Sequence, residues 1–336
     1  MVRSNTILPK QAAGRSSAAQ QDRKERDWTI LFYLCGDHGQ WSKRIRQNLK
    51  DIGTIEPSEH MYIAVQHDLA KEDAKRFVII DKHVAEADKI PVGEINTGDP
   101  NTALEFFRWA IKECPSKHVA IVFGGTGIAE PDSIVGNVDA VGDYEQLFAF
   151  CDDKSAQDAM NPVELGEIFS VLADDRKGKP IDLVAFDMCS MQYLEIAYQL
   201  KDKVEVMIAS QNNEKAPEWS YAKLLKDCID LLKPKAESPD SATQLSHDLS
   251  DLIKQLKVKG HADPNDPRVL AAIVVRAISD TYYKNHVRGL KPMVSALDLK
   301  HIDRVTRSLD TLFLTLMRSL GNDVSGKHAT VLSRNC

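Results

Sequence analysis

The sequence predicts an α/β fold, in which a mainly parallel sheet is flanked by helices on both faces and a mostly helical C-terminal region follows. Two observations predict the sheet. Short apolar runs alternate with helical segments, and each run is apolar throughout and not only at every second position, as is typical of strands buried on both faces. A third observation predicts the C-terminal region, because from about Leu224 the pattern is helical, with a polar break at 259–267.

The predicted elements follow one another along the chain. The core strands are expected at 28–34, 62–68, 118–123, 183–186 and 204–210, with a short extra strand at 76–80. Helices are expected at about 41–52 and 102–112, from Pro162 onward, and directly after Cys189, and Thr102 is a candidate N-cap for the second of these. The polar stretch 128–158 has the composition of a functional or disordered loop.

Composition suggests three regions. The first 26 residues are rich in Ser, Ala, Gln, Lys and Arg without an apolar segment, which predicts a disordered N-terminal arm and not a signal peptide. We expect the α/β domain at 27–222 and the helical region at 223–336.

Charge and cysteine usage limit the class of protein. The net charge is −6 with both signs mixed, which argues against nucleic-acid binding, and no apolar run is as long as a membrane span. The six cysteines show neither paired spacing nor a zinc-ligand pattern. We therefore expect the protein to be located in the reducing cytoplasm. Secretion without a recognisable signal is the alternative. A monomer without membrane contact is expected, and an oligomer is left open.

Cys189 is the leading candidate for chemistry. It lies just beyond a predicted buried strand, where open α/β sheets place their functional residues. A position near the start of the next helix would favour the thiolate. The alternative is a buried structural cysteine.

Short motifs occur in a fixed order between residues 27 and 320. The most specific is 186–191 with 195–198; the others are 28–31 with 36–37, 65–66 with Asp68, 96–100 with Trp109, Pro115 with His118, 125–127, 152–153, Ser210 with 219–221, and 295–298. In this order the motifs resemble those of the clostripain family of cysteine peptidases, which have the caspase-like fold.

The resemblance implies that Cys189 is the nucleophile. The family's catalytic histidine directly precedes a Gly-Ser-Gly-like turn at the end of the third core strand. That turn matches 125–127, so Gly124 occupies the histidine's position. An isolated thiol with a pKa near 8.5 is only slightly ionised at pH 7, and nothing then protonates the leaving amine. Loss of one member of such a pair costs on the order of 10³–10⁶ in rate, so we expect a very poor peptidase.

Other histidines are candidates for a replacement base. His38, just past the first strand, is the best of them, and its alternative interpretation is a solvated loop histidine. His118 is expected at the far end of the sheet with a structural role, and His67 is expected farther from Cys189 still.

Several residues are candidates for substrate contact. Backbone N–H groups of Gly125 and Cys189 are expected to form an oxyanion hole. By the resemblance, Asp187 matches the acidic residue that lines the S1 pocket in members selective for Arg or Lys, as a carboxylate that selects a cation would. The alternative is that Asp187 caps the turn into the next helix. Glu214 is a candidate second acid, and Glu218 replaces a glycine that the family often carries.

The resemblance has three further implications. Lys154 loosely matches a position of activating cleavage, although an exposed loop lysine needs no such role. No cofactor is expected, and calcium is suggested by the family alone, since no loop has an EF-hand pattern. Family chains continue past the helix expected at 299–320, so the chain is expected to be a fragment or a shortened member.

Two functions therefore remain open at this point. The first is an inactive or strongly impaired clostripain-like protein that binds basic peptide segments or regulates a partner. The second is an active cysteine endopeptidase that cleaves after Arg or Lys with another base such as His38. An engineered substitution at Gly124 in an ordinary peptidase would give the same sequence.

Overall fold

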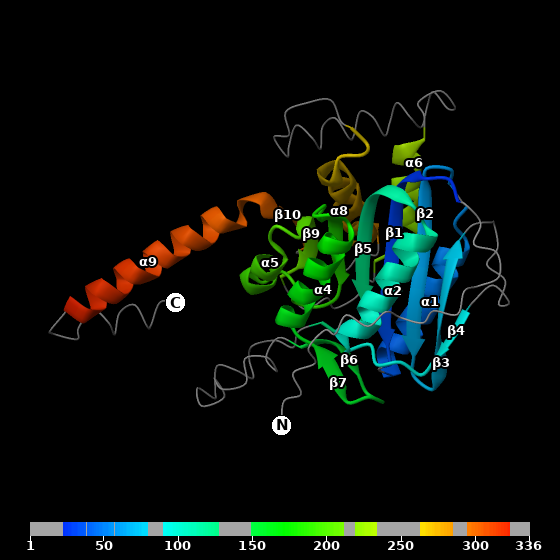
Figure 1. Ribbon diagram of the computed structural model, residues 1–336, viewed down its shortest axis with the longest axis horizontal. Helices are drawn as coiled ribbons and strands as arrows, with labels where there is room; N and C mark the ends of the chain where they lie inside the picture. Colours follow the sequence, from blue (N-terminus) through cyan, green and yellow to red (C-terminus); the bar gives the residue numbers. More distant parts are fainter. Residues whose placement is uncertain are drawn as a thin grey trace.

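The computed structural model describes residues 23–37, 39–56, 58–79, 90–127, 149–211, 219–233, 263–284 and 294–322. Within these ranges the chain forms an eight-stranded sheet with the strand order β10-β9-β8-β5-β1-β2-β3-β4 (Figure 1). Its strands are β1 (Arg26–Gly36), β2 (Met61–Leu69), β3 (Glu72–Ile79), β4 (Ile90–Gly93), β5 (Ser116–Gly124), β8 (Ile181–Asp187), β9 (Val204–Ser210) and β10 (Val294–Asp298).

The centre of the sheet is parallel and its edges are antiparallel. Strands β9, β8, β5, β1 and β2 run in one direction, whereas β10 at one edge and β3 and β4 at the other run against their neighbours. The predicted fold class, a mainly parallel sheet with helices on both faces, is confirmed.

Helices cover both faces of this sheet, which explains why the central strands are apolar throughout. Along β1, Ile30, Phe32 and Leu34 belong to one buried cluster, while Leu31 and Tyr33 belong to another on the opposite face. The first cluster packs under α1 (Gly39–Gly53), α6 (Tyr221–Leu232) and α8 (Pro267–Lys284). The second packs under α2 (Pro100–Glu113), α4 (Pro162–Asp175) and α5 (Leu194–Leu200), and Figure 1 shows α2 and α4 side by side over the sheet.

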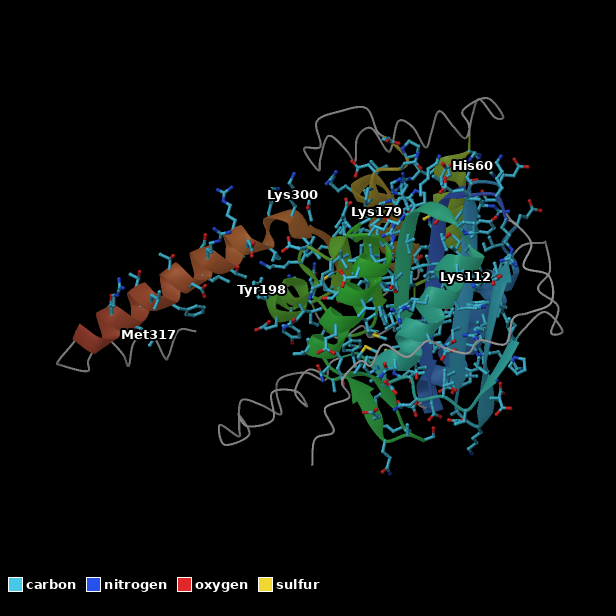
Figure 2. The ribbon with its side chains drawn as sticks, viewed as in Figure 1. His60, Lys112, Lys179, Tyr198, Lys300 and Met317 are labelled. Atoms are coloured by element: carbon cyan, nitrogen blue, oxygen red, sulfur yellow. The ribbon has the colours of Figure 1, made fainter. Side chains whose placement is uncertain are left out.

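The two ends of the parallel strands are chemically different. His60 and Lys179, labelled in Figure 2, mark the end at which β2 and β8 begin. At the opposite end, the hairpin of β6 (Phe150–Asp153) and β7 (Asp158–Met160) packs beside the carboxyl end of β1 (Figure 1). The predicted functional residues at Gly124 and Cys189 lie at this carboxyl end.

Some element boundaries differ from the prediction. The helix after Cys189 does not begin at once: α5 starts at Leu194, because the Gln192 N–H donates to the Ser210 carbonyl 2.9 Å away and holds the intervening residues in a turn. The N-cap of α2 is Asp99, whose carboxylate accepts from the Asn101 N–H, and not Thr102. Pro100 then occupies the first helical turn, where its missing N–H costs nothing.

The C-terminal region contains a strand that the sequence did not predict. Strand β10 pairs with β9 at the sheet edge, and because Ser295 and Ala296 remain exposed there, the strand lacks a strong apolar signal. Helix α6 crosses the expected boundary between residues 222 and 223. The division into domains stays a prediction, and most of the expected N-terminal arm, residues 1–22, lies outside the described residues.

The last described helix extends away from the sheet. After a short 3-10 turn, η4 (Leu299–His301), helix α9 (Ile302–Asn322) projects from the body of the protein, with Met317 near its far end (Figures 1 and 2). Several of its apolar side chains are exposed, namely Val305, Leu312, Phe313, Leu314 and Met317. None of the helices in the described part of the chain has the length and apolarity needed to cross a membrane.

Candidate active site

The sheet register aligns the residues at the carboxyl edge. Leu34 of β1 is the partner of Gly124 of β5, and Gly124 is the partner of Asp187 of β8. Residues paired in this way in a parallel sheet point to the same face, which here is the face covered by α1 and α6. Cys189 follows Asp187 by two residues, in the turn that ends β8.

Cys189 is more exposed to solvent than the residues on either side of it. Its side chain is partly exposed, whereas Met188 and Ser190 on either side are buried. Ser190 has a positive φ of 52°, so the chain turns sharply directly after the cysteine. Cys189 is therefore more exposed than the alternative of a fully buried cysteine implies, and its role as nucleophile stays a prediction.

The turn after β5 packs directly onto this cysteine. A Cβ atom on Gly127 would overlap the backbone of Cys189, so only a glycine permits so close an approach. Gly125 is similarly tight, since a Cβ there would lie 2.6 Å from the carbonyl oxygen of Cys35. The Gly125 N–H donates to the Asp187 carbonyl oxygen at 3.4 Å, a long bond that continues the ladder between β5 and β8.

The space beside Gly124 is occupied by other side chains. A Cβ atom at this position would lie 2.8 Å from Tyr221 Oη and 2.9 Å from Leu34 Cδ2. Tyr221 is fully buried at the start of α6, and its ring centroid lies 4.9 Å from the ring centroid of Phe32. Any larger side chain at position 124 therefore requires the Tyr221 hydroxyl and the Leu34 methyl group to move.

Asp187 is buried, and its contacts among the described residues include Arg44 and Tyr221. Its Oδ1 accepts a hydrogen bond from Arg44 Nη2 at 2.6 Å, and its Oδ2 accepts one from the Tyr221 hydroxyl at 2.9 Å. The side chains of Arg44 and Asp187 are 9% and 2% exposed, so this is a buried ion pair. Arg44 also lies over the ring of Trp41, with its guanidinium carbon 4.6 Å from the ring centroid. In this arrangement a guanidinium already contacts the carboxylate that the sequence assigned to an S1 pocket.

Comparison with known proteins identifies the family. The sequence profile of the clostripain family matches residues 33–334. This chain belongs to the clostripain family. A comparison with curated proteins finds no match.

Two solved structures of C11 proteases share the fold of this clostripain-family chain. One is a secreted C11 cysteine protease from Bacteroides thetaiotaomicron in complex with an irreversible peptide inhibitor, with 16% identity and a TM-score of 0.54 over 82% of this chain and 67% of that chain. The other is an inactive zymogen C11 protease from Parabacteroides distasonis, with 17% identity and a TM-score of 0.57 over 87% and 67% of the two chains. At such low identity these likenesses establish the fold alone.

The described histidines lie away from Cys189. His67 is buried inside β2 and pairs in register with Leu34 of β1, whose partner Gly124 pairs with Asp187. His67 therefore lies three strand spacings, or roughly 14 Å, from Asp187. His118 lies near the start of β5, where its Nδ1 is 2.7 Å from Asp182 Oδ1 and its ring stacks on Trp28. These contacts fit the structural role expected of His118.

Three of the sequence candidates lie outside the described residues. They are His38, the alternative base, and the two acids Glu214 and Glu218. Lys154 is described and lies in the turn between β6 and β7, with a side chain that is 58% exposed and paired with Asp152. Its role in processing, like those of Gly125 and Asp187, stays a prediction.

The sequence did not associate Arg44 or Tyr221 with Asp187. Tyr221 belongs to one of the family motifs, so the sequence marked it as a residue of interest. Nothing in the sequence indicated its hydrogen bond to Asp187. No sequence pattern indicated a role for Arg44, because a single arginine on an amphipathic surface helix is usually solvated. Among the described residues, no group of three or more His, Cys, Asp or Glu side chains has the arrangement of a metal site, and calcium binding stays a suggestion of the family resemblance.

A buried carboxyl group near this edge makes stability depend on pH. Asp68, near the end of β2, is 1% exposed, and neither of its carboxylate oxygens has a hydrogen-bond partner among the described residues. Burial, together with the nearby carboxylates of Asp153, Glu94 and Asp37, raises the pKa of Asp68 to about 8. The folded chain therefore holds a proton on Asp68 at a pH at which the unfolded chain releases it.

We expect the free energy of unfolding to fall as the pH rises from about 4 to about 8, because the raised pKa favours folding only while Asp68 remains protonated. Asp68→Asn should reduce this slope, to which Glu164, whose pKa burial raises to about 7, also contributes, and should increase stability at pH 8 on the order of 2 kcal/mol. Urea unfolding at pH 5 and pH 8 measures both effects. Asp73→Asn, at an exposed carboxylate on β3, is the matched control, and an equal pH slope in Asp68→Asn and the parent would contradict the prediction.

Proposed function

We propose that this clostripain-family chain is a strongly impaired or inactive peptidase that binds peptide segments with basic residues at the edge formed by Cys189 and Asp187. In this proposal Cys189 retains the nucleophile's position, and Gly124 stands where the family carries its catalytic histidine. The chain would act by holding a peptide or regulating a partner protein and not by cleaving it.

The environment of Gly124 is the observation that carries the proposal. Glycine has no side chain and therefore supplies no base. The space that a side chain at position 124 would need is filled by the Tyr221 hydroxyl and a Leu34 methyl group, neither of which carries a nitrogen atom. The Tyr221 hydroxyl donates to Asp187 and is therefore held in place by a hydrogen bond. A cysteine peptidase without a partner base loses both thiolate formation and protonation of the leaving amine.

The pairing of Asp187 with Arg44 supports the preference for basic segments. A carboxylate that already binds a guanidinium has the charge and geometry to bind the arginine of a peptide. An external arginine must then displace Arg44, so affinity for basic peptides should be limited by this internal competitor.

The partial exposure of Cys189 favours a second candidate function, an active endopeptidase with Cys189 as the nucleophile and His38 as the base. Hydrolysis of an Arg-containing fluorogenic peptide by the unmodified protein separates the two. We expect no turnover above that of Cys189→Ala. Turnover that disappears in Cys189→Ala and in His38→Ala would overturn the proposed function and establish the second.

Binding of a basic peptide tests the remainder of the proposal. We expect fluorescence anisotropy to show weak binding of an Arg-containing peptide by the unmodified protein and at least about tenfold tighter binding by Arg44→Ala, because the internal competitor is removed. Arg46→Ala is the matched control, since Arg46 lies on the same helix and pairs with Glu72 in an exposed position. Equal affinities in all three proteins, or binding unaffected by Asp187→Asn, would contradict the role of Asp187.

A further inference from the structure

Two cysteines far apart in the sequence meet at the carboxyl edge of the sheet. Cys35 lies near the carboxyl end of β1 and Cys151 lies in β6, 116 residues later, and their Sγ atoms are 2.6 Å apart. Both side chains are at most 1% exposed. The sequence showed no paired spacing here, because the fold alone brings these two residues together.

The geometry of this contact favours a covalent bond. A disulfide has an S–S distance of about 2.05 Å, so only a small further approach of the two sulfur atoms is needed. The backbone beside the pair is already fixed: the Cys151 N–H donates to the Thr126 carbonyl oxygen at 2.9 Å, and Cys151 has a positive φ of 53°. The local structure therefore holds Cys151 against β1 before any bond forms.

The pair also contacts the turn that packs on Cys189. On one side, a Cβ on Gly125 would lie 3.0 Å from the Cβ of Cys35, so the turn rests on this residue. On the other side, Thr126 is hydrogen-bonded to Cys151. Gly127, the next residue, approaches the backbone of Cys189. A bond between Cys35 and Cys151 would hold the turn from both sides.

We propose that Cys35 and Cys151 are a redox pair, which forms a disulfide on reaction with a low-molecular-weight disulfide and thereby fixes β1, β6 and the 125–127 turn relative to one another. The thiolate of one cysteine attacks the external disulfide, forming a mixed disulfide and releasing one thiolate. The second cysteine then attacks the protein sulfur of this mixed disulfide and releases the other. Overall, the two protein S–H bonds and the external S–S bond are broken. One protein S–S bond and the two S–H bonds of the released thiols are formed, so the protein is oxidised and the external disulfide is reduced.

Burial determines how fast this exchange takes place. Burial and the neighbouring Cys151 raise the pKa of the Cys35 thiol well above its ordinary value, which keeps the thiolate scarce in the closed structure. Exchange therefore requires transient opening of the β6–β7 hairpin, and once formed the bond is shielded from external thiols.

Peptide mapping by mass spectrometry tests the proposal. The unmodified protein is incubated for hours with oxidised glutathione or with a phosphine reductant, denatured in N-ethylmaleimide and digested without reduction. We expect a peptide linking Cys35 to Cys151 after oxidation and two alkylated peptides after reduction. Alkylation of both cysteines after oxidation, or a link from either one only to Cys189, overturns the proposal.

Thermal unfolding tests whether the bond fixes the structure. Oxidation should raise the Tm by roughly 5–10 °C, because it closes a long loop in the unfolded chain. Cys35→Ser and Cys151→Ser should each abolish the linked peptide and the rise in Tm, whereas Cys114→Ser and Cys228→Ser, at buried cysteines outside the pair, should keep both. If a serine variant does not fold, the oxidised and reduced forms of the unmodified protein still decide the matter, and equal Tm values for the two overturn the proposal.

Discussion

Placing histidine at Gly124 together with Tyr221→Phe is expected to raise the hydrolysis of an Arg-containing fluorogenic peptide by at least about 10³-fold over the unmodified protein. Under the proposed function, the histidine would supply a general base at position 124 and protonate the leaving amine. The second substitution is needed because a Cβ at position 124 would lie 2.8 Å from Tyr221 Oη, and phenylalanine removes that atom while retaining the ring that packs on Phe32. The Leu34 methyl group, 2.9 Å from the same Cβ, must still move by rotation of the leucine side chain.

The controls separate restored chemistry from a change in folding. Tyr221→Phe alone should remain inactive, Gly124→His alone should be less active than the double variant, and Cys189→Ala in the double variant should abolish turnover. Circular dichroism and the Tm establish that each protein is folded. A folded double variant without turnover would contradict the idea that Gly124 is the main cause of inactivity.

The sequence predicted the sheet well for a physical reason. A strand such as β1, buried by helices on both faces, must be apolar at consecutive positions, and such runs are visible without any knowledge of tertiary structure. The edge strand β10 is different, because Ser295 and Ala296 are exposed and backbone pairing with β9 determines their conformation. The turn after Cys189 depends in the same way on a distant bond, from Gln192 to Ser210.

The site shows the same division between local and distant information. The position of Cys189 at the end of β8 follows from a local pattern and a family motif. The contacts of Asp187 with Arg44 and Tyr221 do not, because these residues come from α1 and α6, 143 residues before and 34 residues after it. Sequence patterns place residues on elements, whereas side-chain pairing between elements is decided by how the helices pack on the sheet.

The ion pair between Arg44 and Asp187 leads to the largest expected effect on stability. We expect Arg44→Ala to lower the free energy of unfolding by about 3–5 kcal/mol, because it removes the guanidinium that pairs with the buried carboxylate of Asp187. Arg46→Ala removes an exposed pair with Glu72 and should change stability by about 0.5 kcal/mol or less. Urea denaturation at pH 7 measures both variants under the same conditions.

A double-mutant cycle distinguishes the ion pair from simple loss of packing around Arg44. Asp187→Asn alone should also destabilise, since it removes the carboxylate that pairs with the buried guanidinium. Arg44→Met with Asp187→Asn should lose less stability than the sum of the losses in Arg44→Met and in Asp187→Asn, by on the order of 1–3 kcal/mol, because the interaction between the two side chains is lost only once. Additive losses would mean that the two side chains stabilise the protein independently, and the internal guanidinium would then be no competitor for a basic ligand at Asp187.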